Sequence, residues 1–251
     1  MENRKVWKII MGRGKKIVTY KNLLTVTEGK SMEPMVPLSK FKIRTCIQKE
    51  DMFRYTGNEI FVREEVAKRL VWVRSEICSK LHIDIQRLEK LKNLELVVTY
   101  GYRHPEVQKE YFEKILTKLY FEHNHEINQS ILLYPEAHNY VAVPNVAGHP
   151  TGGAVDVTLY ADGVELDMGT KIADFSKPEL IPTFSPHITP EQLENRLVLR
   201  GHMMSQGFAP FNGEWWHFSY GDKEWAYWYY QKKSIYQQIK FTFKDVIYEK
   251  E

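Results

Sequence analysis

Three features of the sequence predict an α+β fold. Apolar residues recur with helical spacing over residues 63–81, a continuous apolar strand covers residues 94–100, and residues 154–159 alternate as a strand does. These elements follow one another without the regular strand–helix–strand alternation of a doubly wound sheet, which favours the α+β class. Of the 251 residues, 43% are hydrophobic and 27% charged, the ordinary balance of a folded chain.

The first 50 residues differ from the rest, and we interpret them as an N-terminal extension packed on a main domain of residues 51–251. They are rich in lysine, contain a loop at residues 30–37, and allow weak strands at residues 16–20 and 23–26. The first clear helix covers residues 63–81. Its apolar positions recur at steps of three and four, at Val66, Leu70, Val73, Ile77 and Leu81.

The middle of the chain combines a buried strand with a second helix. Residues 94–100 read LELVVTY and end at a turn, residues 101–105. Pro105 is well placed as the first residue of a helix, because proline fits that position. The apolar stripe of this helix consists of Val107, Tyr111, Ile115 and Leu119. One face of the helix is therefore expected to pack on the core.

Two long loops frame the strand at residues 154–159. The first covers residues 134–153 and contains three prolines and three glycines, and the second covers residues 162–188. Within the strand, Val155 and Val157 share one face and are expected to fill the core, since strand side chains alternate. Asp156 then points to the opposite face.

A capping box predicts the last long helix. Thr189 is the N-cap, Pro190 the first helical residue and Gln192 the third, a pattern that satisfies free amide groups at a helix start. The helix is expected to end just before Gly207, a residue type that favours the position after a C-cap. An aromatic strand is predicted at residues 214–220.

Composition excludes several classes of protein. The 35 basic and 32 acidic residues give a net charge of +3, too small an excess for a typical nucleic-acid binder. The absence of 18 consecutive apolar residues argues against a transmembrane helix. The N-terminus has no uninterrupted apolar stretch of a signal peptide, so we expect a cytoplasmic protein, with a periplasmic or secreted one as the alternative. Cys46 and Cys78 are interpreted as free thiols.

Common catalytic motifs are incomplete or missing. Residues 12–14 begin a dinucleotide-binding pattern, but Ile17 stands where its third glycine belongs. His125 begins a zinc-protease helix motif, but Gln129 replaces its second histidine. We therefore interpret His123 and His125 as solvated residues at a helix end.

A set of four residues remains as candidate chemistry: His149, Asp156, Glu214 and His217. Zinc accepts histidine nitrogen and carboxylate oxygen, and a catalytic zinc site uses three protein ligands and an open position for water. The glycines at positions 152 and 153 allow a tight bend, so that a loop histidine can fold back beside a strand aspartate.

Glu214 and His217 are three residues apart, which would place them on opposite faces of a flat strand. They can face one site only if Glu214 lies in the turn after Gly213 or if the strand bulges there. Two plainer readings stay open. His217 could be a buried, hydrogen-bonded histidine among aromatic residues, and Asp156 could be a turn cap.

The pattern from His149 to Asp156, followed by Glu214-Trp-Trp-His217, resembles the VanX-type zinc D-Ala-D-Ala dipeptidases of peptidase family M15. Residues 101–103 look like that family's arginine segment, and residues 167–175 like the loop after its metal strand. The resemblance covers roughly residues 60–230. It implies a hedgehog/D,D-peptidase-like fold with a central, mainly antiparallel sheet flanked by helices.

The resemblance also implies one zinc ion per chain and a role for each matching residue. His149, Asp156 and His217 would be zinc ligands, and Glu214 would be the general base and acid. Arg103 would stabilise the oxyanion of the tetrahedral intermediate. Zinc polarises the scissile carbonyl and acidifies water, which a nearby carboxylate then deprotonates.

Three further residues are expected to contribute to the substrate pocket: Tyr102, Asp174 and Trp216. The sequence also departs from the family pattern. Ala147 stands where the family has a serine, and His104 separates the arginine from its usual proline. These departures concern the choice of peptide and leave the metal and the base untouched.

The expected reaction is the zinc-dependent hydrolysis of D-alanyl-D-alanine to D-alanine. One alternative is a D,D- or L,D-carboxypeptidase or endopeptidase acting on longer peptidoglycan peptides. Another is a non-catalytic zinc-binding interaction protein. The expected partner is a small D-amino-acid peptide, without nucleic acid or membrane, and the oligomeric state is left open.

Overall fold

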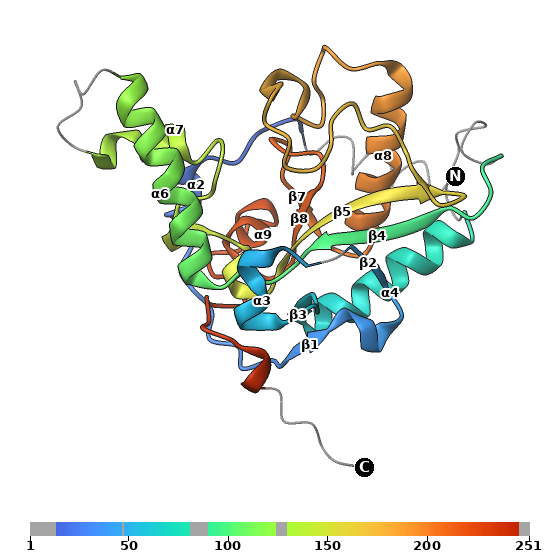
Figure 1. The fold of residues 1–251 in the computed structure, drawn as a ribbon, viewed down its shortest axis with the longest axis horizontal. Helices are drawn as coiled ribbons and strands as arrows, with labels where there is room; N and C mark the ends of the chain where they lie inside the picture. The colour runs from blue at the N-terminus through green and yellow to red at the C-terminus, as the bar shows by residue number, and fades with distance from the viewer. Residues whose placement is uncertain (1–13, 47, 81–89, 124–129, 246–251) are drawn as a thin grey trace.

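The structure is a computed structural model that describes residues 14–46, 48–80, 90–123 and 130–245 (Figure 1). Two positions of the sequence predictions, Leu81 at the end of the first long helix and His125, lie outside the described residues.

A six-stranded mixed sheet forms the centre of the described fold. Its strands follow the order β2-β4-β5-β8-β7, and β6 pairs with β5. β2 runs parallel to β4, whereas the other pairs of this sheet are antiparallel. The predicted α+β class with a mainly antiparallel sheet is confirmed. The strands are β2 Arg44–Thr45, β4 Glu95–Tyr100, β5 Ala154–Ala161, β6 Val164–Glu165, β7 Ala209–Pro210 and β8 His217–Ser219.

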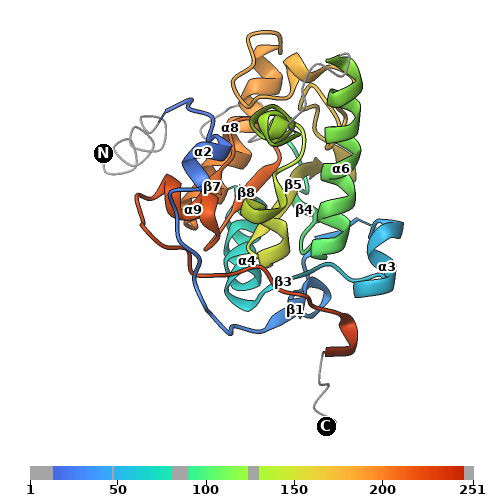
Figure 2. The ribbon, with the colours of Figure 1, turned by 90° about the vertical axis from the view of Figure 1, so that its left-hand side faces the viewer.

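Helices flank this sheet, and Figure 2 shows α6 on the opposite side of it from α8. The helices are α2 Tyr20–Leu23, α3 Glu50–Thr56, α4 Glu64–Cys78, α6 Pro105–Glu122, α7 Tyr134–Ala137, α8 Pro190–Ser205 and α9 Lys223–Trp228. α4 and α8 contact each other and the sheet. Their apolar residues form the main core with Val155, Val157 and Leu159 of β5, which leaves the opposite face of β5 for polar side chains.

The long helices begin where local signals place them. Thr189 Oγ1 accepts the N–H of Gln192 at 3.2 Å, and the Gln192 side chain accepts the N–H of Thr189 at 2.9 Å. This is the predicted capping box of α8. Gly207 follows the C-cap with φ 80°, in the left-handed region that glycine adopts freely. In α6, His104 caps the first turn and Pro105 is the first residue.

The two weak strands predicted at residues 16–20 and 23–26 are wrong. Thr19 and Asn22 form another capping box, which starts α2 instead. Thr19 Oγ1 accepts the N–H of Asn22, and Asn22 Oδ1 accepts the N–H of Thr19. Satisfying the free amide groups of a helix start outweighs the strand preference of the β-branched residues nearby.

Residues on both sides of position 50 pair with each other. β1 (Met35–Pro37) is antiparallel to β3 (Phe61–Arg63), and β2 is an edge strand of the central sheet. The domain boundary predicted at residue 50 stays a prediction. The second long loop is interrupted by β6, which forms a short hairpin with β5.

Cys46 and Cys78 are free thiols, as expected. Among the helices of the described residues, none combines the length and apolar character needed to cross a bilayer.

Candidate metal centre and active site

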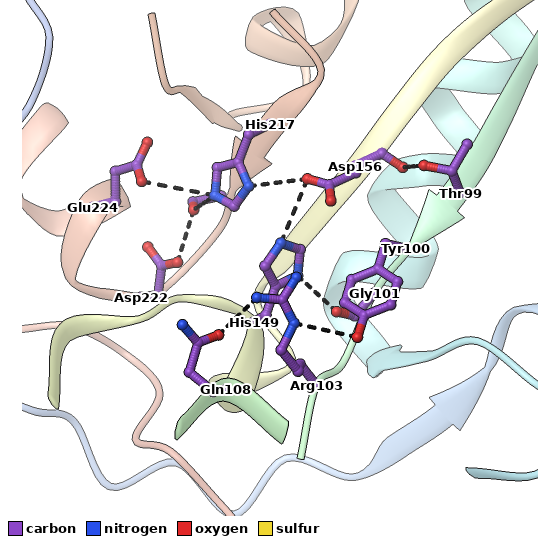
Figure 3. Close-up of polar contacts among 11 residues, drawn as sticks. Thr99, Tyr100, Gly101, Arg103, Gln108, His149, Asp156, His217, Asp222 and Glu224 are labelled. Carbon is purple, nitrogen blue, oxygen red and sulfur yellow. Dashed lines mark hydrogen bonds and ion pairs between the residues drawn. The ribbon is translucent and has the colours of Figure 1, made fainter. Parts of the chain in front are cut away.

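Three side chains converge where β5 and β8 pair (Figure 3). Asp156 and His217 are direct cross-strand partners, and His149 lies in the short helical turn just before β5. His149 Nε2 lies 3.4 Å, and His217 Nδ1 3.0 Å, from the same Oδ1 of Asp156. One possible ligand atom of each residue lies within 4.8 Å of the others, and all three side chains are buried. The structure therefore brings the three predicted ligands together.

A glycine turn folds His149 back beside β5. Gly152 has φ 75°, and its N–H donates to the carbonyl of His149 at 3.0 Å. A Cβ at Gly152 would lie 2.6 Å from Met35 Sδ, so a larger residue would be both strained and obstructed. The predicted tight bend before the strand is present.

The second ring nitrogen of each histidine is held by a different neighbour (Figure 3). His149 Nδ1 donates to the carbonyl of Gly101 at 2.7 Å, which leaves Nε2 as the nitrogen that faces Asp156. His217 Nε2 faces Ser219 Oγ at 3.5 Å and Glu224 Oε2 at 3.7 Å. Such outer contacts fix the ring orientation of metal-ligating histidines.

Charge and burial act against each other in this cluster. Burial lowers the pKa of His149 to about 4. Burial has the same effect on His217, but Asp156 and then Glu224 outweigh it and raise the pKa of His217 to about 10. Burial would raise the pKa of Asp156, yet the two histidines hold it below its usual range. The ionised carboxylate thus attracts positive charge, either a proton or a metal ion.

The donor set fits zinc. Two imidazole nitrogens and one carboxylate oxygen converge from two paired strands and the turn before β5, and all three residues are buried. Zinc accepts both donor types, and catalytic zinc sites use three protein ligands. The remaining nitrogen of each imidazole already has a polar neighbour, as ligating histidines require.

Glu214 lies in a turn, and the aromatic strand predicted at residues 214–220 is shorter than expected because β8 begins only at His217. The N–H of Glu214 donates to the carbonyl of Phe211 at 3.0 Å, and the N–H of His217 donates to the carbonyl of Glu214 at 3.2 Å. Glu214 and the three cluster residues line one cavity. This satisfies the stated condition that Glu214 follow Gly213 in a turn. Burial raises the pKa of Glu214 to about 7.

Arg103 borders the same cavity and is firmly held. Its Nε donates to Tyr100 Oη at 3.2 Å, and its Nη1 donates to Gln108 Oε1 at 2.9 Å. Its guanidinium also packs on the rings of Tyr100 and Tyr111, at 4.7 and 4.9 Å from their centroids. Its backbone N–H donates to the carbonyl of His149 at 3.3 Å, which ties the arginine segment to the metal cluster.

The three predicted pocket residues have different surroundings. Trp216 lines the cavity. Tyr102 is directed elsewhere: its hydroxyl donates to the carbonyl of Ile239 at 2.8 Å and accepts the N–H of Phe241 at 2.9 Å. Asp174 borders a separate surface hollow and accepts the N–H of Ser176 at 3.0 Å. The structure does not bring Tyr102 and Asp174 to the cavity, so a role for either in substrate binding stays a prediction.

Other cavity residues escaped the sequence analysis. Lys49, Gln108, His138 and Glu224 all line the cavity. Only Glu224 had a nearby signal, since it follows His217 by seven residues in an acidic segment. His123, outside the cavity, is exposed and pairs with Glu136 at 3.1 Å, in agreement with a solvated helix end.

The fold and this site together define a class of protein, the metallopeptidases. A His–Asp–His cluster lies at the central sheet of an α+β fold, and the carboxyl group of Glu214 and the guanidinium of Arg103 border the same cavity. The chain belongs to the peptidase M15 family, described as D-ala-D-ala dipeptidase, whose family model matches residues 43–239. This match confirms the resemblance drawn from the motifs and extends beyond residues 60–230.

Two curated relatives carry the name D-alanyl-D-alanine dipeptidase. The protein of Synechocystis sp. is 36% identical over 124 residues, which cover 43% of this chain and 50% of the relative. The protein of Enterococcus faecium is 32% identical over 85 residues, which cover 32% of this chain and 40% of the relative. The chain thus matches half or less of the length of these relatives.

Solved structures show a weaker likeness. A zinc-bound mutant of the vancomycin resistance D,D-pentapeptidase VanY has a TM-score of 0.38 and 17% identity, covering 85% of this chain and 97% of that chain. The LD-carboxypeptidase LdcB has a TM-score of 0.42 and 18% identity, covering 81% of each chain. Both TM-scores are below 0.5, so the family assignment rests on the sequence match alone.

Proposed function

We propose that the chain is a zinc-dependent dipeptidase that hydrolyses D-alanyl-D-alanine to D-alanine. The observation that carries the proposal is the buried cluster of His149, Asp156 and His217, with Glu214 bordering the same cavity. These residues all lie within the stretch that matches the family. We assign the three cluster residues as ligands of one zinc ion per chain.

Zinc, when bound, would polarise the scissile carbonyl and make water more acidic. Glu214 would take the proton of the attacking water and return it to the leaving amine as the C–N bond breaks. Such proton transfer typically contributes about 10²–10⁴-fold in rate. A pKa near 7 allows this carboxyl group to gain and lose a proton at neutral pH.

Arg103 would donate to the oxyanion that develops on the scissile carbonyl. Its contacts with Tyr100 and Gln108 fix the guanidinium before the substrate binds. Preorganised donors of this kind contribute roughly 3 kcal/mol, because they need no rearrangement as charge develops.

The test is an assay of D-alanine release with and without added zinc. The substrates are D-alanyl-D-alanine, L-alanyl-L-alanine and a pentapeptide that ends in D-alanyl-D-alanine. Zinc-dependent release from the D,D-dipeptide alone is the expected result. Release from the pentapeptide alone would identify a carboxypeptidase. Zinc binding without cleavage of any of the three would contradict the proposal and favour a binding role.

A further inference from the structure

One cation in the cavity has no part in the reaction proposed above. Lys49, immediately before α3, is exposed to solvent, and part of its side chain lines the cavity together with His149 and Glu214. Its Nζ lies over the ring of Tyr100, 4.8 Å from the ring centroid. Within the described parts of the chain, no side chain or carbonyl forms a hydrogen bond or an ion pair with this ammonium group.

Tyr100 places Lys49 beside the reaction centre. The Tyr100 ring meets the ring of His149 edge-on at 5.3 Å between centroids, and Tyr100 pairs with Asp156 across β4 and β5. The pKa of Lys49 is lowered overall. Burial and the charge of Arg103 lower it, and the charges of Asp156, Asp51 and Glu214 oppose this shift only in part. The ammonium of Lys49 therefore lies within the electric field of the site.

The charges that line the cavity are not evenly distributed. Glu214 and Glu224 belong to the β7–β8 turn and to α9, whereas Lys49 and Arg103 belong to the segments beside β4. Burial raises the pKa of Glu214 to about 7 and that of Glu224 to about 8, so these carboxyl groups are partly protonated at neutral pH and offer a peptide carboxylate no positive charge. Arg103 is assigned above to the oxyanion and is held by Tyr100 and Gln108, so Lys49 is the other basic side chain of this cavity that can meet the substrate carboxylate.

We propose that Lys49 binds the free C-terminal carboxylate of the substrate and so selects peptides that end within the cavity. This inference rests on the proposed function and deepens it by naming the residue that recognises the free end of the substrate. An ammonium on a flexible four-carbon stem can follow the position of a carboxylate, and the resulting hydrogen bond is charge-assisted. A peptide that continues past this point would bring no charge to Lys49.

The experiment compares two substrates that differ only in this charge, D-alanyl-D-alanine and D-alanyl-D-alaninamide, in the zinc-loaded full chain. Lys49→Met should raise KM for the free acid roughly 10- to 100-fold, the loss typical of a charged hydrogen bond, and leave kcat within about twofold. For the amide, Lys49→Met and the unchanged chain should give the same KM. Lys49→Arg should restore most of the affinity for the free acid.

The matched control is Lys109→Met, because Lys109 is exposed on α6 and pairs with Glu113 outside the cavity. It should change KM for neither substrate. An equal loss on both substrates with Lys49→Met would show a structural role, and no loss on the free acid would show no contact. Either result overturns the proposal.

Calorimetric binding of the same two compounds separates this inference from the proposed function. Binding of the free acid that depends on Lys49, without any cleavage, would overturn the dipeptidase function and uphold the carboxylate contact. Cleavage of the free acid with the same KM in Lys49→Met as in the unchanged chain would uphold the function and overturn the contact. Absence of both binding and cleavage would overturn both.

Discussion

The two histidines of the metal cluster approach the same aspartate oxygen from very different surroundings. The Nδ1–H of His149 donates a hydrogen bond to the backbone carbonyl of Gly101. In His217 it is Nε2 that faces away from the aspartate, toward Ser219 and the carboxyl group of Glu224. The pKa of His149 is lowered to about 4, and that of His217 is raised to about 10. Both rings are buried. Neighbouring carboxylates, rather than burial, therefore decide which histidine carries charge.

Asp156→Asn removes the group that both histidines share, and it should have the largest effect. Turnover should be lost, and zinc affinity should fall by more than the ~10–100-fold typical of losing an outer contact. The pKa of His217 should fall, because its strongest charge-stabilising partner is gone. Chelator competition measures the affinity, and NMR titration measures the pKa. Asp162→Asn, at the exposed turn between β5 and β6, is the control, and unchanged zinc affinity in Asp156→Asn would refute the role of Asp156 as a ligand.

Glu214→Gln leaves the three clustered donor residues in place and tests the proton transfer. We expect kcat to fall by about 10²–10⁴-fold, since the proton acceptor is lost. Zinc affinity should change little, because Glu214 is not among the three clustered donors. The two quantities are measured on the same zinc-titrated sample. Full turnover in this variant would remove Glu214 from the mechanism, and Glu179→Gln, an exposed residue, provides the comparison.

Glu224→Gln disturbs only the side of the cluster that contains His217. Glu224 Oε2 lies 3.7 Å from His217 Nε2, and loss of such an outer carboxylate typically lowers metal affinity about 10–100-fold. The His149 side has no equivalent variant, because its partner there is a backbone carbonyl. Chelator competition again provides the measurement. An affinity equal to that of Glu179→Gln would show that Glu224 does not support the ligand.

His138 is a buried histidine outside the His–Asp–His cluster, so it shows what burial alone does to a histidine pKa. Its effect, on stability rather than on metal binding, is expected to be the smallest of these predictions. Burial alone lowers the pKa of His138 to about 4, against about 6.5 in an unfolded chain. Between these values the unfolded state binds more protons, so stability falls as pH drops below about 6.5 and falls no further below about 4. From pH 7 to pH 5 this residue should account for a loss of about 2 kcal/mol.

Urea unfolding of the zinc-free protein at several pH values measures this dependence. The slope of stability against pH should be smaller in His138→Gln than in the unchanged chain. His187→Gln, at an exposed loop position, should keep the original slope. Equal slopes in the two variants would mean that His138 is protonated in the folded state as easily as in the unfolded one.

Local patterns in the sequence predicted those parts of the fold that local forces determine. The capping box at Thr189 and Gln192 specifies the start of α8, and the alternation around Asp156 specifies which face of β5 is polar. The odd spacing between Glu214 and His217 required either a turn or a bulge, and the structure has the turn. In each case a few neighbouring residues decide the geometry.

Contacts between distant segments could not be predicted in this way. Lys49 reaches the cavity from a point 100 residues before His149, and only the pairing of β4 with β5 brings Tyr100 between them. Tyr102 shows the reverse, because it is adjacent to Arg103 in sequence yet turns to Ile239 near the C-terminus. A motif thus identifies the candidate ligands, but the residues that surround them depend on tertiary packing.

The pairing of β4 with β5 skips one residue, since Val98 lies opposite Val157 and Tyr100 opposite Asp156. The extra residue, Thr99, donates its hydroxyl to the carbonyl of Asp156 at 3.1 Å. Such a β-bulge adds one unpaired residue to a strand and bends the strand locally. Deleting Thr99 would therefore remove the bulge, and with it the local bend just before Gly101 and Arg103, the two residues whose backbones bond to His149. A single inserted residue in a strand thus sets the direction of the segment that follows it.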